Sequence, residues 1–473
     1  MNMSPAALTP ELTLTAGAVL GILLGSWLPR HRQWVVRLLA ALACLVGLTA
    51  TAAAIGGAPQ LVFGGSYAVD TATNAGRVIV LAATLLTICL SIDTVGSHPR
   101  ETEFYVLMLL AALGTIMLVG ATDLLLLMAA YLLASIPLYA LAGFAKDALG
   151  TEASLKYYLM GALLGVIMLT GITALYGAGR STGYATLAQT LPSGPPAAVA
   201  VGLVAVLAGL LFKIGGVPAH FWVPDITEGA STPVAAFVTT VPKIGGLIAT
   251  YRLVAEALPA AGVNWPLLVA MLATASMTLG NLAAFFQDTV RRLLAYSTIS
   301  QVGYLLLAVT VATRSEIALP ALLFYLAAYA VTNLGAFAVV AALPHAPNLA
   351  DYRGLARRHP GLAAALVVCL LGLVGTPPTA VFLGKLEIFS AAIDGGYTWL
   401  AVVAVVNTVA SLFYYLRWIA PALVAAPETD SEKVLAPAGR WPVLGAYTAA
   451  AASLALGVAG GVVLPLVSGP SLL

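Results

Sequence analysis

The sequence predicts an all-α protein that crosses a membrane about fourteen times. Hydrophobic residues make up 61% of its 473 residues and charged residues only 8%, with a mean hydropathy of +0.99. Soluble domains carry roughly 25% charged residues. The apolar residues form stretches of about 20, the length a helix needs to cross a bilayer. A net charge of +2 gives no reason to expect a nucleic-acid partner.

Fourteen spans can be placed along the chain, with short connections between them. They begin near residues 12, 34, 76, 103, 122, 156, 197, 230, 262, 292, 317, 361, 397 and 441. Lysines and arginines gather in every second connection, starting with Arg30 and Arg32, whereas the other connections carry only Arg77, Arg180, Arg252 and Arg314. The positive-inside rule then places both termini outside. Because the first charged residue is the acidic Glu11, we expect no cleavable signal peptide.

The spans divide into four parts. Residues 1–102 hold three uniformly apolar spans, interpreted as a scaffold without paired polar groups. Residues 103–257 hold five spans, helices 4 to 8, and residues 258–420 hold another five, helices 9 to 13. A loop and helix 14 complete the chain at 421–473. Because five is odd, the second block enters the membrane from the opposite side, which predicts a pair of inverted repeats.

The fourth span of each block contains a glycine- and proline-rich interruption beside a lysine. The first reads FKIGGVP, with Lys213 before Pro218, and the second reads GLVGTPPTAVFLGK, with Pro377 and Pro378 before Lys385. Proline interrupts the helical hydrogen bonds, which a membrane helix tolerates where the freed carbonyls line a cavity. Ordinary proline kinks are the alternative. Matching broken helices in inverted halves indicate an ion or substrate path.

Three lysines, Lys213, Lys243 and Lys385, lie within predicted spans. A lysine near the bilayer centre costs several kcal/mol. Snorkelling of each side chain to the interface is the simpler interpretation, but it accounts poorly for all three together. Desolvation disfavours the charged ammonium and a nearby carboxylate restores it, so a buried lysine can load and release a proton. The three lysines predict a lateral row of proton-relay sites.

Five segments of this sequence resemble the antiporter-like membrane subunits of respiratory complex I, the proton-pumping NADH:quinone oxidoreductase. The resemblance covers most of the chain, and the N-type subunits are the most similar members, because Pro242 precedes Lys243 and Lys385 stands where M-type subunits carry glutamate. The segments are FKIGGVPAHFWVPDITEGASTPVAAFVTTVPKIGG at 212–246, GNLAAFFQDTVRRLLAYSTISQVGYLLLA at 280–308, YLAAYAVTNLGAFAVV at 325–340, DYRGLARRHP at 351–360 and LLGLVGTPPTAVFLGKLEIF at 370–389.

The resemblance implies a role for each buried lysine. Lys213 is similar to the central relay of helix 7, Lys243 to the connecting lysine of helix 8, and Lys385 to the helix 12 residue of the exit half. His220 resembles a histidine beside the helix 7 break, where it is either a relay or a structural donor. The resemblance also implies a bacterial plasma membrane location and M-, K- and J-type membrane subunits as partners.

No redox centre is expected in this chain. Its three cysteines, Cys44, Cys89 and Cys369, lie in apolar spans without CxxC or Cys/His spacing. The resemblance places FMN, iron–sulfur clusters and quinone in partner subunits. Two alternatives stay open: the equivalent subunit of a membrane-bound hydrogenase or multisubunit cation/proton antiporter, and a paralogue impaired in pumping.

The sequence departs from the family pattern at two positions. The family carries a glutamate in the fifth helix, in a motif like ELLSLPLY, which pairs with the helix 7 lysine; here LLASIPLY places Leu132 there. Asp123 lies nine residues earlier, about 13 Å along a helix, and is a weak substitute. Gln301 stands where many relatives have histidine, and it cannot take up a proton. Leu132 predicts that Lys213 faces a leucine instead of a carboxylate.

Overall fold

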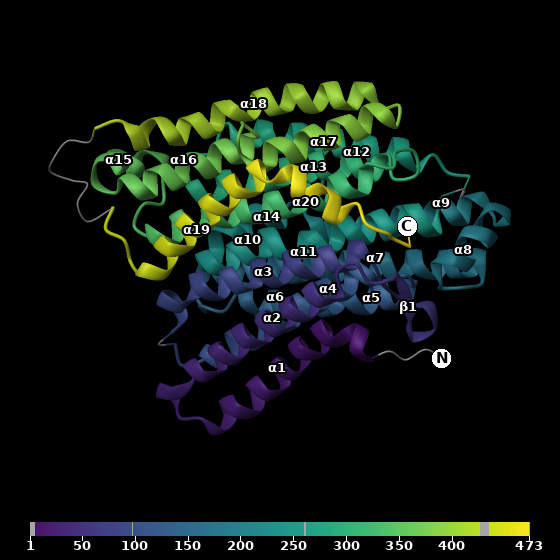
Figure 1. The fold of residues 1–473 in the computed structure, drawn as a ribbon, viewed down its shortest axis with the longest axis horizontal. Helices are drawn as coiled ribbons and strands as arrows, with labels where there is room; N and C mark the ends of the chain where they lie inside the picture. The colour runs from purple at the N-terminus through teal and green to yellow at the C-terminus, as the bar shows by residue number, and fades with distance from the viewer. Residues whose placement is uncertain (1–4, 97, 260–261, 426–434, 473) are drawn as a thin grey trace.

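The computed structural model describes residues 5–96, 98–259, 262–425 and 435–472, and it is helical almost throughout (Figure 1). This confirms the predicted fold class. Within the described residues, 13 helices are long and apolar enough to cross a membrane. The count falls one short of the expected fourteen because the twelfth predicted span is divided into two helices of 15 residues each.

The helices and strands have the following bounds. The first half contains α1 (Thr9–Trp27), α2 (Trp34–Ala54), β1 (Gln60–Val62), β2 (Tyr67–Val69), α3 (Thr71–Val95), α4 (Glu101–Gly120), α5 (Leu124–Leu133), α6 (Ile136–Ala142), α7 (Ala148–Gly179), α8 (Tyr184–Thr190), α9 (Pro196–Ile214), α10 (Trp222–Gly229) and α11 (Thr232–Arg252). The second half contains α12 (Trp265–Ala284), α13 (Val290–Thr310), α14 (Ala318–Ala342), α15 (Leu355–Arg358), α16 (Pro360–Val374), α17 (Ala380–Asp394), α18 (Thr398–Leu423), α19 (Arg440–Val458) and α20 (Gly460–Val467).

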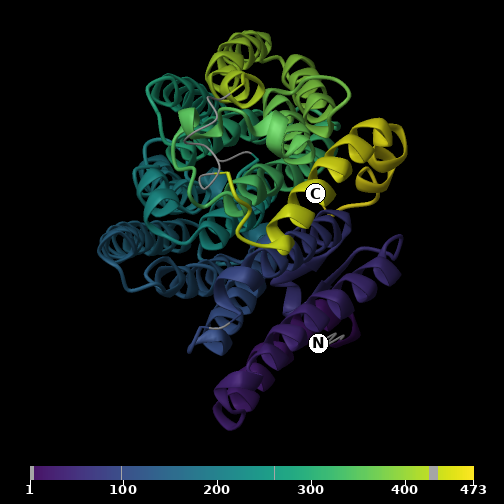
Figure 2. The same cartoon turned by 90° about the vertical axis from the view of Figure 1, so that its left-hand side faces the viewer.

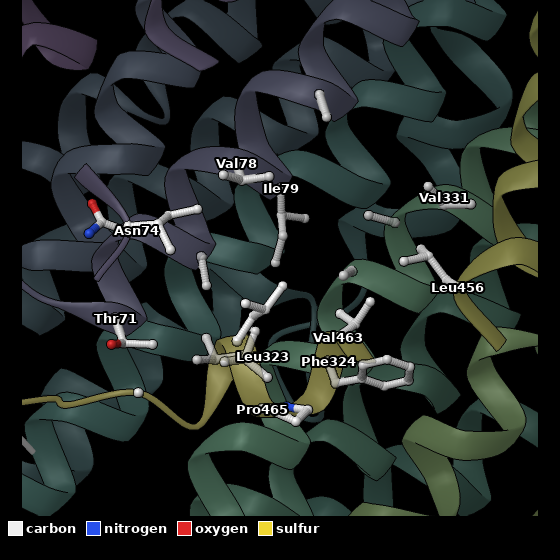
Figure 3. Close-up of a pocket in the computed structure, with 18 of the residues that line it drawn as sticks. Thr71, Asn74, Val78, Ile79, Leu323, Phe324, Val331, Leu456, Val463 and Pro465 are labelled. Carbon is white, nitrogen blue, oxygen red and sulfur yellow. The ribbon is translucent and has the colours of Figure 1, made fainter. Parts of the chain in front are cut away.

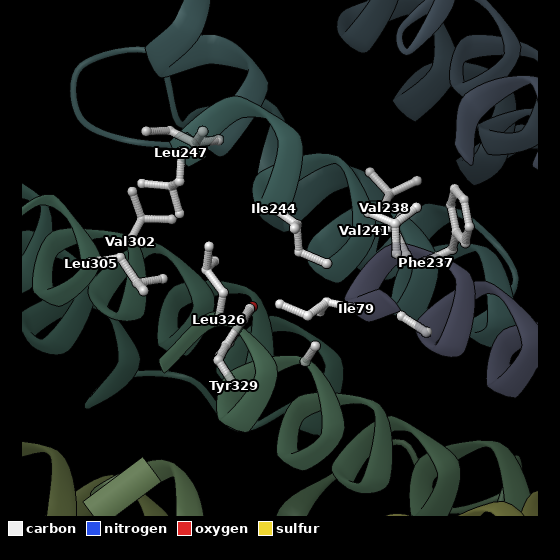
Figure 4. Packing of buried hydrophobic residues seen from close by; sticks show 14 of the residues in the cluster. Ile79, Phe237, Val238, Val241, Ile244, Leu247, Val302, Leu305, Leu326 and Tyr329 are labelled. Carbon is white, nitrogen blue, oxygen red and sulfur yellow. The ribbon is translucent and has the colours of Figure 1, made fainter. Parts of the chain in front are cut away.

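The core lies around α11, α13 and α14, the most deeply buried of the long helices. Ile79 of α3, Val241 and Ile244 of α11 and Tyr329 of α14 point towards one another in this interior (Figure 4). The peripheral helices α1, α2 and α7 instead expose many leucines and valines. In Figure 2, α1 and α2 stand at one edge of the bundle. A large apolar exterior fits a protein whose outer solvent is lipid.

The first three spans contain a buried ion pair, so the expectation of a scaffold without paired polar groups is wrong. Arg77 of α3 donates two hydrogen bonds to the Glu11 carboxylate of α1, at 2.8 and 2.9 Å. Tyr67 donates to the same carboxylate at 2.6 Å, and Arg77 also reaches the Asn74 side chain at 3.1 Å. Glu11 precedes Arg77 by 66 residues, so the sequence around either residue does not predict that they form a pair.

Arg252 forms a second buried ion pair, although the charge pattern placed it in a connection. Its guanidinium donates to Asp70, and both side chains are 0% exposed. It also donates to Glu256 at 2.8 Å and to the carbonyl oxygen of Val119 at 2.8 Å. Asp70 precedes α3 and accepts the amide of Thr73, which caps this helix. The contacts of Arg252 therefore join α11 to α3 and α4.

Candidate functional site

The first predicted helix break lies between α9 and α10. The helix ends at Ile214, and Gly215 follows in the left-handed conformation with φ +73°. This conformation is the usual glycine end of a helix, and the amide of Gly216 bonds back to the carbonyl oxygen of Leu211 at 2.9 Å. The next helix starts at Trp222. The glycines thus end the helix just after Lys213, as the sequence predicts.

The second break has the same construction between α16 and α17. The helix ends at Val374, Gly375 has φ +89°, and the next helix starts at Ala380. Each break also contains one cis peptide bond before a proline, at Pro218 and at Pro378. Both interruptions predicted from glycine, proline and lysine are confirmed as helix breaks. The inverted relation of the two blocks stays a prediction.

Lys213 is fully buried in the last turn of α9. Its Nζ atom donates a hydrogen bond to the Ser135 hydroxyl, and it lies 4.9 Å from the centre of the Tyr131 ring. Ser135 lies at another helix interruption, between α5 and α6. Lys213 therefore joins the break after α9 to the break after α5, through a hydroxyl group.

Leu132 does not take the place of a carboxylate facing Lys213. Its side chain is 41% exposed, whereas Tyr131 and Ser135 beside it are fully buried. The expectation that Lys213 faces this leucine is therefore wrong, because the turn of α5 directs Tyr131 inward. Asp123 caps α5 by accepting the amides of Leu125 and Leu126, which is a structural role at the boundary.

Lys243 lies fully buried in the middle of α11. Its Nζ atom donates to the Thr298 hydroxyl at 2.8 Å and approaches the Thr298 carbonyl oxygen at 3.4 Å. A Cβ atom built on Gly215 would lie 3.4 Å from this Nζ atom. The second lysine therefore sits against the break that follows the first.

Lys385 is 3% exposed and lies on α17, five residues after the start of the helix. Its Nζ atom donates to the carbonyl oxygen of Val374 at 2.9 Å, the last residue of α16. It also reaches the Thr408 hydroxyl at 3.3 Å and lies 4.0 Å from the centre of the Tyr304 ring. A carbonyl freed by the second break is therefore a direct partner of the third lysine.

One face of α13 lies beside two of the buried lysines. The sequence did not predict the contribution of this helix. Thr298 accepts from Lys243, and Tyr304 packs against Lys385. Gln301 lies between them; it donates to the carbonyl oxygen of Leu373 at 2.8 Å and accepts from the Tyr325 hydroxyl. The spacing of three residues was a usable signal, because residues i and i+3 share a helix face.

The three lysines differ from the two buried arginines in their partners. Arg77 and Arg252 each have a carboxylate within hydrogen-bond distance. Within the described part of the chain, no carboxylate lies within 4.0 Å of Lys213, Lys243 or Lys385. Their partners are hydroxyls and carbonyl oxygens. A hydroxyl can accept from an ammonium or donate to a neutral amine, so two of these sites suit either protonation state of the lysine.

His220 lies within the first break, two residues before α10, and it is 5% exposed. Its ring packs against that of Phe221 with a centre-to-centre distance of 4.4 Å. Its Nδ1 atom is buried and has no hydrogen-bond partner among the residues that the structure describes. The structure therefore places His220 at the break, and its role as relay or structural donor stays open.

The Gly215→Ala variant is expected to destabilise the fold. Its left-handed φ disfavours any side chain, and the added Cβ would lie 2.8 Å from Val223 and 3.4 Å from Lys243 Nζ. We expect a loss of about 1–3 kcal/mol in stability, measured as thermal unfolding in detergent. Gly177→Ala is the matched control, since its Cβ would meet nothing within 4 Å. Equal melting temperatures would contradict the tight fit at Gly215.

The Ser135→Ala variant removes the described hydrogen-bond partner of Lys213. A hydrogen bond to a charged group contributes about 1.5–3 kcal/mol, so if Lys213 is the proton-relay site that the sequence predicts, proton flux should fall about tenfold or more. Proton uptake by vesicles containing the assembled protein measures this. Ser135→Thr keeps the hydroxyl and should retain most of the flux. If both variants behave alike, the hydroxyl is not the relevant partner.

Known proteins resemble this chain in both sequence and fold. Residues 121–411 match the family described as "NADH:quinone oxidoreductase/Mrp antiporter, TM". The NADH-quinone oxidoreductase subunit N 1 of Streptomyces griseus is 59% identical over 464 residues, covering 98% of each chain. A chain of respiratory complex I from Thermus thermophilus is 34% identical, with a TM-score of 0.84 over 98% of this chain and 100% of that chain. A chain of the Mrp complex from Dietzia sp. is similar in fold, with a TM-score of 0.85 at 22% identity over 98% of this chain and 97% of that chain.

Proposed function

The chain belongs to the NADH:quinone oxidoreductase/Mrp antiporter membrane family, and on that premise we propose that it is the proton-translocating subunit N of a complex I. The three buried lysines form the relay. Lys213 is the central site, Lys243 the connecting site and Lys385 the exit site. Protons move between them as quinone reduction in partner subunits alters the charge at neighbouring sites.

One observation carries this proposal: three buried lysines lie at or beside the two helix breaks, and none has a carboxylate partner among the residues that the structure describes. A permanently charged lysine in this apolar interior would be costly without compensation. A lysine that alternates between ammonium and amine avoids that cost for part of its cycle. The hydroxyl partners of Lys213 and Lys243 support such an alternation, because each can donate or accept.

The redox chemistry of the proposed complex lies in its other subunits. FMN, iron–sulfur clusters and quinone belong there, and M-, K- and J-type membrane subunits are the proposed neighbours in a bacterial plasma membrane. The contribution of this chain is to hold and transfer protons at lysine Nζ atoms. Its helix breaks supply the carbonyl oxygens, such as that of Val374, that orient the relay.

The decisive experiment is purification of the native complex in mild detergent, followed by analysis of what accompanies the chain. Flavin, iron–sulfur clusters and quinone reductase activity would support the proposal. Nickel would instead identify the subunit of a membrane-bound hydrogenase, and the absence of both would favour a cation/proton antiporter. Proton uptake by the same complex in vesicles would separate an active pump from a pumping-impaired subunit, the remaining alternative.

A further inference from the structure

An apolar groove of about 490 Å³ lies between α3, α14 and the C-terminal helices α19 and α20 (Figure 3). Val78 and Ile79 line it from α3, Leu323 and Val331 from α14, and Val463 from α20. Its only polar side chains among the described lining residues are Thr71 and Asn74, which lie towards one end. None of the buried lysines lines this groove, so it is separate from the proposed relay.

The dimensions of the groove fit a single hydrocarbon chain. Its lining residues on α3 run from Thr71 to Leu86, a rise of about 22 Å at 1.5 Å per residue. Half of a bilayer core is about 15 Å thick, so the groove is long enough for the acyl chain of a lipid from one leaflet.

A polar cavity of about 680 Å³ adjoins the groove at its polar end. Val467 and Gly469 line both spaces, and the cavity continues past the start of α14 to Arg314 and Glu316. The C-terminal segment between the two spaces is held against α3 by a hydrogen bond, which the Thr71 hydroxyl donates to the carbonyl oxygen of Pro470 at 2.7 Å. An apolar groove therefore opens beside a polar cavity that carries one charge of each sign.

The two charged groups of this cavity have no counter-ion in the described structure. Arg314 and Glu316 are exposed, and neither forms an ion pair within 4.0 Å of a described residue. The Arg314 guanidinium lies 5.5 Å from the centre of the Tyr397 ring, which orients it. Arginine suits a phosphate and glutamate suits an ammonium group.

We propose that the groove and the adjoining cavity together bind one zwitterionic phospholipid of the phosphatidylethanolamine type. Its acyl chain lies along α3 and α14, its phosphate contacts Arg314, and its primary ammonium contacts Glu316. An isoprenoid chain would fit the groove, but an uncharged head group would leave both charges without a partner among the described residues. The lipid site contains none of the relay residues. A test of lipid binding is therefore independent of a test of the proposed proton transfer.

The test uses the native complex in vesicles that contain a phosphatidylethanolamine with a photoreactive diazirine in its acyl chain. After irradiation, labelled peptides are mapped by mass spectrometry. We expect labels on α3 and α14 beside Val78 and Leu323, and competition by unlabelled phosphatidylethanolamine. Arg314→Gln and Glu316→Gln should each weaken retention of the lipid about tenfold, as expected for loss of one charge-assisted hydrogen bond. Both residues are exposed, so neither replacement threatens the fold.

A groove-filling variant checks the hydrocarbon part of the site. Ala327→Trp places a large ring among the lining residues of α14 and should abolish the labels on the groove. Val402→Trp is its control, because that side chain is 57% exposed on α18 and lines neither space. Equal labelling of α18 and the groove would overturn the proposal. Equal competition by phosphatidylglycerol, or competition by an isoprenoid quinone alone, would overturn the assignment of the head group.

Discussion

Replacing Lys213 by methionine is expected to reduce proton translocation about a hundredfold or more, which is the contribution of a well-placed proton-transfer group. Methionine has a similar length, so the packing around Tyr131 and Ser135 is retained while the titrating Nζ atom is lost. Proton uptake by vesicles containing the assembled complex, driven by NADH and quinone, measures the effect. Electron transfer is recorded in the same vesicles, so that failure of the redox reaction is recognised.

Two controls separate the relay role from a general need for positive charge. Lys146→Met removes an exposed lysine that forms no ion pair with a described residue, and its flux should match that of the parent. Lys213→Arg keeps the charge but cannot release a proton, and its flux should be as low as that of Lys213→Met. Full pumping by Lys213→Arg would show that Lys213 serves only as a fixed cation.

Replacing Arg252 by methionine is expected to destabilise the protein by about 3–5 kcal/mol, the cost of leaving a buried partner charge uncompensated. Asp70 is 0% exposed and would lose its ion pair with Arg252. Burial opposes ionisation of Asp70, but Arg252 and the amides of Thr73 and Leu472 outweigh it and hold the pKa of this carboxyl below its usual range. Thermal unfolding of the purified complex measures the change.

The double variant Arg252→Met/Asp70→Asn tests the cause. Methionine leaves the carboxylates of Asp70 and Glu256 without their arginine. Asparagine removes the charge of the more deeply buried one, so the double variant should be more stable than Arg252→Met alone. Arg357→Met provides the control, because Arg357 is exposed on α15 and pairs with no carboxylate in the described residues. If the double variant is the least stable of the three, the destabilisation comes from lost packing and not from the charge.

The sequence predicted the helix breaks and the buried lysines because their signals are local. Glycine and proline within an apolar segment predict that the helix is interrupted there. A lysine inside the same segment is easily recognised, because all its neighbours are apolar. The segments around Lys213 and Lys385 both show this, and the structure has a break beside each. The division of the twelfth span also explains why the number of continuous spans was overestimated by one.

The partners of the charged residues could not be predicted, because they come from distant parts of the chain. Ser135 precedes Lys213 by 78 residues, and Asp70 precedes Arg252 by 182. The fold brings each pair together, through the contact of the α5–α6 interruption with the end of α9 and through the packing of α3 against α11. Leu132 shows the same limit, since its alignment with a family glutamate does not reveal which way its side chain points.

The absence of carboxylates beside the lysines in the described structure has an electrostatic consequence for the row as a whole. A proton arriving at Lys243 adds a full positive charge beside the break that follows Lys213, and no described acid neutralises it there. In a medium of low dielectric constant, such a charge acts over long distances. If the three lysines form the proposed relay, protonation of one should therefore disfavour protonation of the next, and a charge that enters at one end should displace another at the far end.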